Sequence, residues 1–161
     1  MKPITIPTFL SHLPTYKGLP VPSTVYVDKD GVPDFKVTDQ VKWMNIVAGR
    51  CCGICGNRLP ETMFFIGGEK SCVAGTFFDP AMCEPCARFS MNVCPFLNFQ
   101  KGYAEHIKEH IGSVITIDPN MSTEKPKKMG LLRTDGFRVE QHGEQLYLRA
   151  KNKLNIEWFE P

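Results

Sequence analysis

Two cysteine pairs constrain the fold of this chain more than any other feature of its sequence. The first pair is Cys52-Gly-Ile-Cys55 and the second is Cys83-Glu-Pro-Cys86, with 27 residues between them. Two residues between thiols let both sulfur atoms of a pair reach one ion, and the glycines in and after the first pair suit a tight turn. We therefore predict one metal site with four thiolate ligands, and a zinc knuckle at residues 52–56.

Zinc is the metal that this donor set favours, because it is borderline-soft and has no geometric preference of its own. A shell of four cysteines leaves no coordination position for water or substrate, so the predicted ion is structural. Two alternatives stay open at this point. One is iron in the same four thiolates, and the other is four reduced cysteines buried as small apolar side chains.

The residues around the pairs predict the frame of a treble-clef zinc finger, which consists of a knuckle, a β-hairpin and a helix. Strand-forming residues 63–66 and 72–78, joined by a turn at residues 67–68, predict the hairpin. Residues 86–94 predict the helix, which Pro95 ends.

The N-terminal part of the chain predicts an arm, two strands and a short helix. Residues 1–22 contain five prolines and predict an extended arm, with a disordered terminus as the alternative. Residues 24–27 and 32–37 predict two strands joined by a turn with Asp-Gly, with Pro33 at an edge or a strand start. Asp39 predicts the N-cap of a helix that reaches residue 48 and ends at a glycine.

That helix has an apolar stripe from which its buried face is predicted. Val41, Met44 and Ala48 share one stripe, and Trp43 and Val47 widen it. We expect the stripe to pack against the core.

After residue 113 the apolar pattern has a period of two, which predicts an antiparallel β-meander. The expected strands are residues 114–117, 130–133, 137–141, 145–149 and 154–159. The fold class is thus α+β, with a proline-rich arm at 1–22, a treble-clef-like zinc domain at 23–111 and a sheet region packed on it at 112–161.

Three cysteines and two histidines lie outside the predicted ligand set. Cys51 is a bystander of the first pair, Cys72 is predicted to be buried on the hairpin, and Cys94 is expected in the core beneath the helix. His106 and His110 share one face of a helix predicted at residues 99–111. They form either part of a solvated face or a second metal site.

Composition limits the classes of partner and the compartment. The formal net charge is +2 and is balanced along the chain, which argues against strong non-specific nucleic-acid binding. The sequence contains neither an apolar run that spans a bilayer nor a signal-peptide pattern. We therefore expect a soluble protein without a membrane partner, located in a reducing cytoplasm.

Five short segments in fixed order resemble a family of small proteins common in bacteriophages and mobile elements. They are Gly-Leu-Pro-Val-Pro at 18–22, Gly-Val-Pro-Asp-Phe-Lys-Val at 31–37, Cys-Gly-Ile-Cys-Gly at 52–56, Cys-Glu-Pro-Cys-Ala at 83–87 and Cys-Pro-Phe-Leu at 94–97. They span roughly residues 16 to 100. In that family the position of Cys83 is usually histidine, another zinc ligand. The resemblance implies a phage or prophage context, with the host cytoplasm as location, and implies no reaction.

Three functions follow from these observations. The first is a non-catalytic zinc protein that binds and modulates a host or defence protein, and the balanced charge favours it. The second is nucleic-acid binding, for which the candidate contacts are Arg88, Lys125, Lys127, Lys128, Arg149, Lys151 and Lys153. The third is an HNH-type nuclease, which the absence of histidine between residues 56 and 105 opposes, because such enzymes need a general base there.

Overall fold

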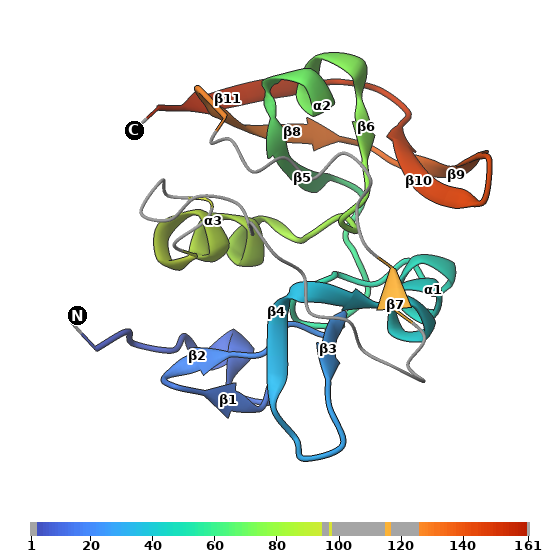
Figure 1. Ribbon diagram of the computed structural model, residues 1–161. Coiled ribbons are helices and arrows are strands. Elements are labelled where there is room, and N and C mark those ends of the chain that lie inside the picture. The colour runs from blue at the N-terminus through green and yellow to red at the C-terminus, as the bar shows by residue number, and fades with distance from the viewer. Residues whose placement is uncertain (1–2, 95–96, 98–114, 117–125, 161) are drawn as a thin grey trace.

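Small antiparallel sheets and short helices build the fold (Figure 1). The structure, a computed structural model, describes residues 3–94, 97, 115–116 and 126–160. The helices in this part of the chain are α1 (Gln40–Ala48), α2 (Glu69–Ala74), α3 (Glu84–Val93) and the 3-10 turn η1 (Thr8–Leu10). The predicted α+β class is confirmed.

The strands form one two-stranded ladder and three three-stranded sheets in the described residues. The ladder is β1-β2, and the sheets have the orders β3-β4-β7, β11-β8-β5 and β6-β10-β9. The strand bounds are β1 Thr15–Tyr16, β2 Leu19–Pro20, β3 Val25–Val27, β4 Pro33–Asp39, β5 Met63–Gly68, β6 Thr76–Phe77, β7 Ile115–Thr116, β8 Met129–Thr134, β9 Phe137–His142, β10 Gln145–Ala150 and β11 Asn155–Phe159.

Strand β5 separates two hydrophobic clusters. Its side chains alternate, so that Phe64 and Ile66 join the cluster that contains the cysteine ligands, while Met63 and Phe65 join the other. The neighbouring strand β8 is divided in the same way between the two clusters. Because both faces of this part of the sheet are covered, β5 reads as a continuous apolar run.

The predicted hairpin between the cysteine pairs is wrong. The segment after β5 folds into helix α2, which ends at Gly75 in the left-handed conformation with φ 73°. The Gly75 amide donates to the Ser71 carbonyl, closing the last helical turn. The next strand, β6, pairs with β10 and not with β5. The predicted order of knuckle, hairpin and helix therefore does not hold between the pairs.

The C-terminal strands fall close to their predicted positions, but their arrangement as a meander is wrong. Among the C-terminal strands that the structure describes, only β9 and β10 form a hairpin, while β8 pairs with β5 and β11. At the turn after β8, the Thr134 hydroxyl donates to the Gly136 carbonyl at 3.0 Å. The next strand, β9, belongs to a different sheet. The C-terminal strands are thus hydrogen-bonded into sheets with strands from earlier in the chain.

Strands β3 and β4 and the start of α1 follow the predictions. Pro33 is the first residue of β4, and the Asp39 carboxylate accepts a hydrogen bond from the Lys42 amide at 3.1 Å. The buried face of α1 is narrower than expected, because Trp43 and Val47 are its buried residues. The indole Nε1 of Trp43 donates to the Phe78 carbonyl at 2.8 Å, which fixes the helix on this face.

The other three residues of the expected apolar face lie on the outer side of α1. Val41 is 52% exposed and Met44 is 49% exposed, and Ala48 is exposed as well. The prediction therefore holds for Trp43 and Val47 and is wrong for the other three residues, since the volume of Trp43 is placed in the core in preference to the smaller side chains.

The described residues 3–22 of the proline-rich N-terminal segment pack on the cysteine cluster through Leu10, with Ile6 and Leu13 beside it. The segment forms η1 and the β1-β2 ladder, whose turn contains Lys17 and Gly18 with positive φ. Leu10 is completely buried in the cluster that contains the cysteine ligands. The segment therefore covers one side of the cysteine group.

Candidate metal centre

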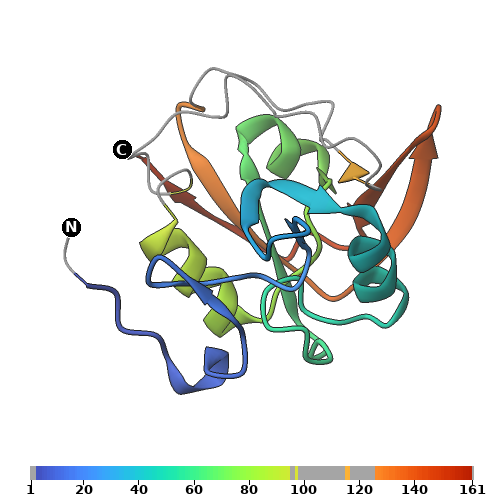
Figure 2. The same ribbon diagram turned by 60° about the horizontal axis from the view of Figure 1, so that its bottom comes forward.

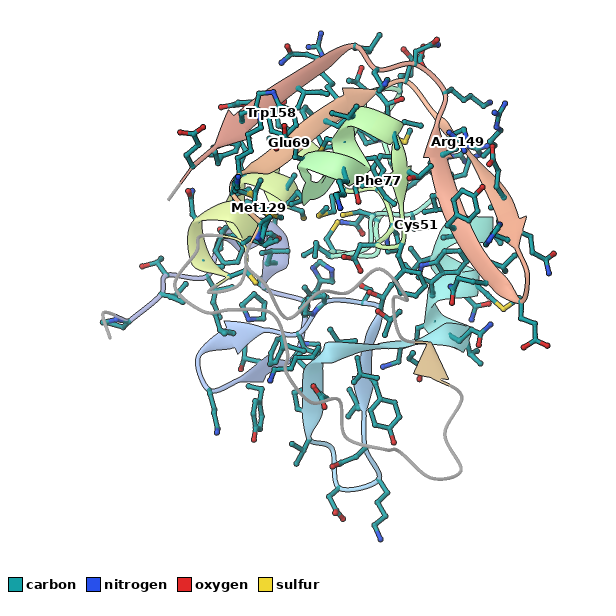
Figure 3. All side chains as sticks on the ribbon, turned by 45° about the horizontal axis from the view of Figure 1, so that its top comes forward. Cys51, Glu69, Phe77, Met129, Arg149 and Trp158 are labelled. Atoms are coloured by element: carbon teal, nitrogen blue, oxygen red, sulfur yellow. The ribbon has the colours of Figure 1, made fainter. Side chains whose placement is uncertain are left out.

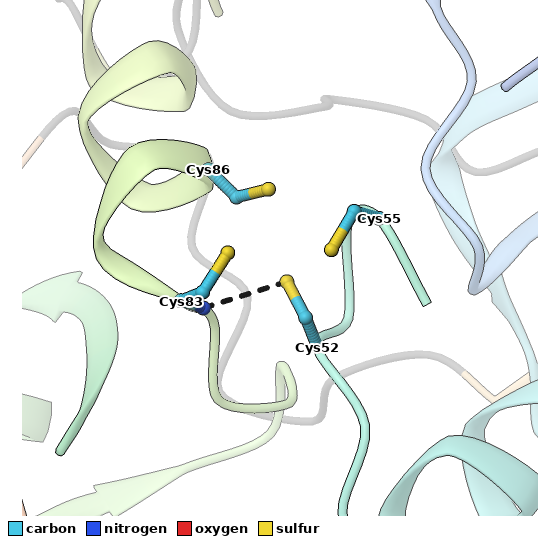
Figure 4. A group of neighbouring side chains, drawn as sticks. All are labelled: Cys52, Cys55, Cys83 and Cys86. Carbon is cyan, nitrogen blue, oxygen red and sulfur yellow. Dashed lines mark hydrogen bonds between the residues drawn. The ribbon is translucent and has the colours of Figure 1, made fainter. Parts of the chain in front are cut away.

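Four cysteines from two distant segments meet between a turn and the start of α3 (Figure 4). The sulfur atoms of Cys52, Cys55, Cys83 and Cys86 all lie within 4.8 Å of one another. Tetrahedral Zn–S bonds of 2.3 Å place sulfur atoms about 3.8 Å apart, so small side-chain movements suffice for a shared ion. The four predicted ligands are close enough to bind a metal ion.

The first pair lies in a tight turn that its own backbone closes. The Cys52 amide donates to the Asn57 carbonyl at 2.7 Å, and the Gly56 amide donates to the Cys52 carbonyl at 2.9 Å. Gly56 has a φ of +76°, the left-handed region that glycine adopts without strain. A Cβ atom at this position would also lie 2.9 Å from the Ser23 hydroxyl. The predicted turn at residues 52–56 is present.

The second pair belongs to the first turn of α3. Cys83 is the N-cap residue, and its carbonyl accepts from the Ala87 amide at 3.0 Å. Pro85 occupies the first turn, where a missing amide hydrogen costs nothing. The free amides and the positive end of the helix dipole favour negative charge at this end of a helix. The helix start therefore suits a thiolate at Cys83.

Backbone hydrogen bonds join the two halves of the site. The Gly53 amide donates to the Ala81 carbonyl at 3.0 Å, immediately before the second pair. The amides of Ile54 and Cys83 approach the Cys52 sulfur at 3.4 and 3.5 Å, and Figure 4 shows the second of these contacts. Such contacts orient the sulfur and disperse its charge.

Burial and mutual contact shape the protonation of the four thiols. Cys52, Cys55 and Cys86 are buried and Cys83 is half-buried. Hydrogen bonds from the thiols of Cys52 and then Cys86 lower the pKa of Cys83 to about 4. Contact with Cys52 and then Cys83 raises the pKa of Cys86 well above that of a free thiol. The group therefore holds one thiolate readily, while further thiolates repel it unless a cation lies between them.

The N-terminal segment forms an outer layer of the site that the sequence did not reveal. The Nε2 atom of His12 lies 2.7 Å from the carbonyl oxygen of Cys55, and the Ser23 hydroxyl donates to the Ile54 carbonyl at 2.9 Å. With buried Leu10, these contacts fix the turn from outside. No sequence signal indicates them, because 43 residues separate His12 from Cys55.

The other cysteines differ in burial. Cys72 is completely buried, as predicted, although it lies on α2, and burial raises its pKa to about 11. Cys51 is half-buried, and its sulfur donates to the Gly49 carbonyl. Cys94 is half-buried at the end of α3. None of the three belongs to the four-thiol group.

We expect iodoacetamide to distinguish these thiols in the folded, metal-loaded protein. Cys51 should react within minutes, because it is partly accessible, whereas Cys72 should stay unmodified. The four grouped cysteines should react only after a chelator is added. Peptide mass spectrometry measures the sites, and unfolded protein with all seven cysteines modified is the control. Labelling of Cys72 at the rate of Cys51 in folded protein contradicts this view.

Two of the candidate nucleic-acid contacts are paired with carboxylates near α3 and β11. Arg88 on α3 bonds Glu84 at 3.0 Å and Glu157 at 3.1 Å. The Lys128 ammonium lies 3.5 Å from Glu69 and 4.2 Å from the ring centroid of Trp158. Their charges are therefore partly balanced within the chain.

The remaining basic residues lie elsewhere. Arg149 on β10 bonds Glu140 at 2.7 Å, and hydrogen bonds from Arg149 and then Tyr147 lower the pKa of Glu140 to about 2. Lys153 donates to the Val73 carbonyl, and the Lys151 chain covers Gly136. Figure 3 shows Arg149 far from Trp158, which marks the position of Lys128. Arg149 and Lys153 both reach the end of α2, where they donate to the carbonyls of Ala74 and Val73.

Several predicted features lie outside the described residues. They are Lys125, the helix at residues 99–111 and its histidines His106 and His110. Lys127 is described and exposed. Among the helices that the structure describes, none has the length and apolar character needed to cross a membrane. Comparison with protein-family models, with curated proteins and with solved structures finds no match.

Proposed function

We propose that this chain is a non-catalytic interaction protein whose fold depends on one structural zinc ion held by Cys52, Cys55, Cys83 and Cys86. The convergence of four thiols from two distant segments within 4.8 Å supports it most directly. Thiolate sulfur is soft, and four such donors in a tetrahedral arrangement are typical of zinc. Three of the four are buried, which suits a closed structural site.

The donor set argues for a structural role rather than catalysis. A catalytic zinc ion has three protein ligands and an open position for water or substrate. Here a fourth thiolate would fill that position. The nearest described histidine contact, from His12, reaches a backbone oxygen of Cys55 and not a sulfur. We therefore assign the ion the task of holding the first turn against α3.

The proposed partner is a host or defence protein of a bacterial cell. The resemblance to small bacteriophage proteins is the basis for that partner class. The low net charge of +2 supports a protein partner over nucleic acid. Pairing of Arg88, Lys128 and Arg149 with carboxylates supports it further, because phosphate binding needs cations that are not already neutralised.

Metal content tests the first part of the proposal. Elemental analysis of protein purified without chelator should give one zinc per chain. Iron in place of zinc would change the identity of the ion but keep the site. Less than half an equivalent of any metal contradicts the proposed structural role.

Fluorescence titration with random duplex DNA tests the choice of partner. We expect no binding at low salt. Binding that weakens steeply as salt is raised indicates phosphate contacts and replaces the protein partner with nucleic acid. If DNA binding is seen, the variant Lys127→Glu should change the affinity, since Lys127 is an exposed candidate contact.

A further inference from the structure

Strand β9 is an open sheet edge. In the order β6-β10-β9 its only described neighbour is β10, and Figure 2 shows this hairpin, in orange-red, extending from the body of the molecule. All six residues of β9 pair with β10 in a continuous register without a bulge. The strand contains no proline or lysine, the residues that commonly protect an edge from pairing.

The turn of the hairpin determines which backbone groups face outward. A two-residue loop joins the paired residues His142 and Gln145, and Gly143 has a φ of 61°, as a type II′ turn requires at its first central position. Such a turn begins from a hydrogen-bonded pair, so alternate residues of β9 bond to β10.

Hydrogen bonds at the other end of the hairpin agree with this alternation. The Lys151 amide donates to Gly136 on the β9 side, while the Ala150 amide donates to Gly75 on the opposite side. Phe137, Val139 and Gln141 therefore direct their amide and carbonyl groups to the open edge. In the described residues no other backbone group bonds to them.

The side chains of β9 complement a second copy of the same strand. In an antiparallel pair centred on Val139, each Arg138 lies opposite the Glu140 of the other copy. The Arg138 side chain is 65% exposed, and the Glu140 side chain is 24% exposed. Val139 is 48% exposed and would meet itself at the centre. Charge and apolar contact thus match in one register.

We propose that β9 pairs with β9 of a second copy, in a symmetric antiparallel dimer whose two-fold axis passes through Val139. Phe137 then faces Gln141 of the other copy, and about six backbone hydrogen bonds join the two sheets. The pairing turns the β6-β10-β9 sheet into one continuous six-stranded sheet. It does not depend on the proposed zinc role, because no residue of β9 belongs to the four-thiol group or to the hydrophobic cluster that contains it.

The charges allow the new contacts without loss of the old ones. Glu140 accepts hydrogen bonds from Arg149 and Tyr147 of its own chain, and Arg138 reaches it at 2.8 Å. A carboxylate has room for about four acceptor contacts. In the dimer, Arg138 can bond across the axis while Arg149 and Tyr147 keep Glu140 in place.

Sedimentation of the full, metal-loaded chain over a concentration series tests the proposal. We expect twice the mass of one chain at high concentration. Val139→Lys puts two ammonium groups at the axis and should weaken the dimer at least about 100-fold. Val73→Lys is the matched control, since Val73 is 59% exposed on α2 and should leave the mass unchanged. Circular dichroism and zinc content confirm that both variants are folded.

Amide hydrogen exchange by NMR gives a readout specific to this register. The amides of Phe137, Val139 and Gln141 should exchange slowly only at concentrations where the dimer forms. The amides of Arg138 and Glu140 should be protected at all concentrations, because they bond to β10. A monomer at every concentration overturns the proposal. A dimer that survives Val139→Lys also overturns it, since that dimer must use another surface. Pairing of β9 with a different protein in place of a second copy overturns it as well.

Discussion

Replacement of Cys86 by serine is expected to unfold the protein, including the region between the knuckle turn and α3 and the clusters that pack on it. The ion that we propose contributes an apparent ~10 to 16 kcal/mol of binding free energy in sites of this type, and that energy is coupled to folding. A serine hydroxyl is a poor zinc ligand, and Cys86 is completely buried, so the variant also leaves a polar group in the apolar cluster. Loss of near-ultraviolet circular dichroism and of bound zinc measures the effect.

Cys51→Ser is the matched control for this change. Cys51 adjoins the first ligand but lies outside the four-thiol group, and its sulfur donates to the Gly49 carbonyl at 3.4 Å. We expect a change of about 1 kcal/mol or less in the free energy of unfolding and full zinc content. Equal stability of the Cys51 and Cys86 variants, or a stable Cys86 variant without metal, contradicts a structural ion.

Phe65→Ala is expected to lower the free energy of unfolding by about 3–5 kcal/mol, because it leaves a cavity in the second hydrophobic cluster. Phe65 is 0% exposed, and its ring stacks on Phe77 at a centroid distance of 4.6 Å and meets the edge of Phe137 at 6.0 Å. These partners come from β6 and β9, so the cavity lies where three strands meet. Urea unfolding followed by circular dichroism gives the value.

The same variant should still bind one zinc per chain under native conditions. Phe65 lies on the face of β5 opposite to Phe64 and Ile66, which pack with the ligands. Val73→Ala, at a residue 59% exposed, should change the stability by no more than about 0.5 kcal/mol. A loss below 1 kcal/mol for Phe65→Ala, or loss of zinc in the folded variant, is incompatible with this division of the core.

The sequence predicts the ligands well because their spacing is a local property. Because two residues separate the thiols of each pair, both sulfur atoms of a pair can bind the same ion wherever the pair lies. The four-thiol site then requires only that the fold bring the two pairs together. Strand positions such as that of β9 follow from local alternation as well. Strand partners do not, since the pairing of β8 with β5 is decided by burial of both faces.

Where local signals conflict, the sequence predicts the wrong element. Around Cys72 the residues are compatible with strand or helix, and the left-handed Gly75 decides for a helix by closing its last turn. In α1 two apolar faces compete, and periodicity alone does not show that Trp43 occupies the core in place of Met44. The prolines of the first 22 residues exclude helix interior but say nothing of the burial of Leu10, which needs distant partners.

The alternation of side chains along β5 has a consequence for how the molecule fails. One strand supplies neighbouring residues to both clusters, so we expect that neither cluster melts while the other keeps its packing. Loss of packing at the cysteine group should therefore disturb the aromatic cluster around Trp43, because adjacent residues of β5 belong to the two clusters. The protein should behave as one cooperative unit, with the ion and the aromatic cluster lost together.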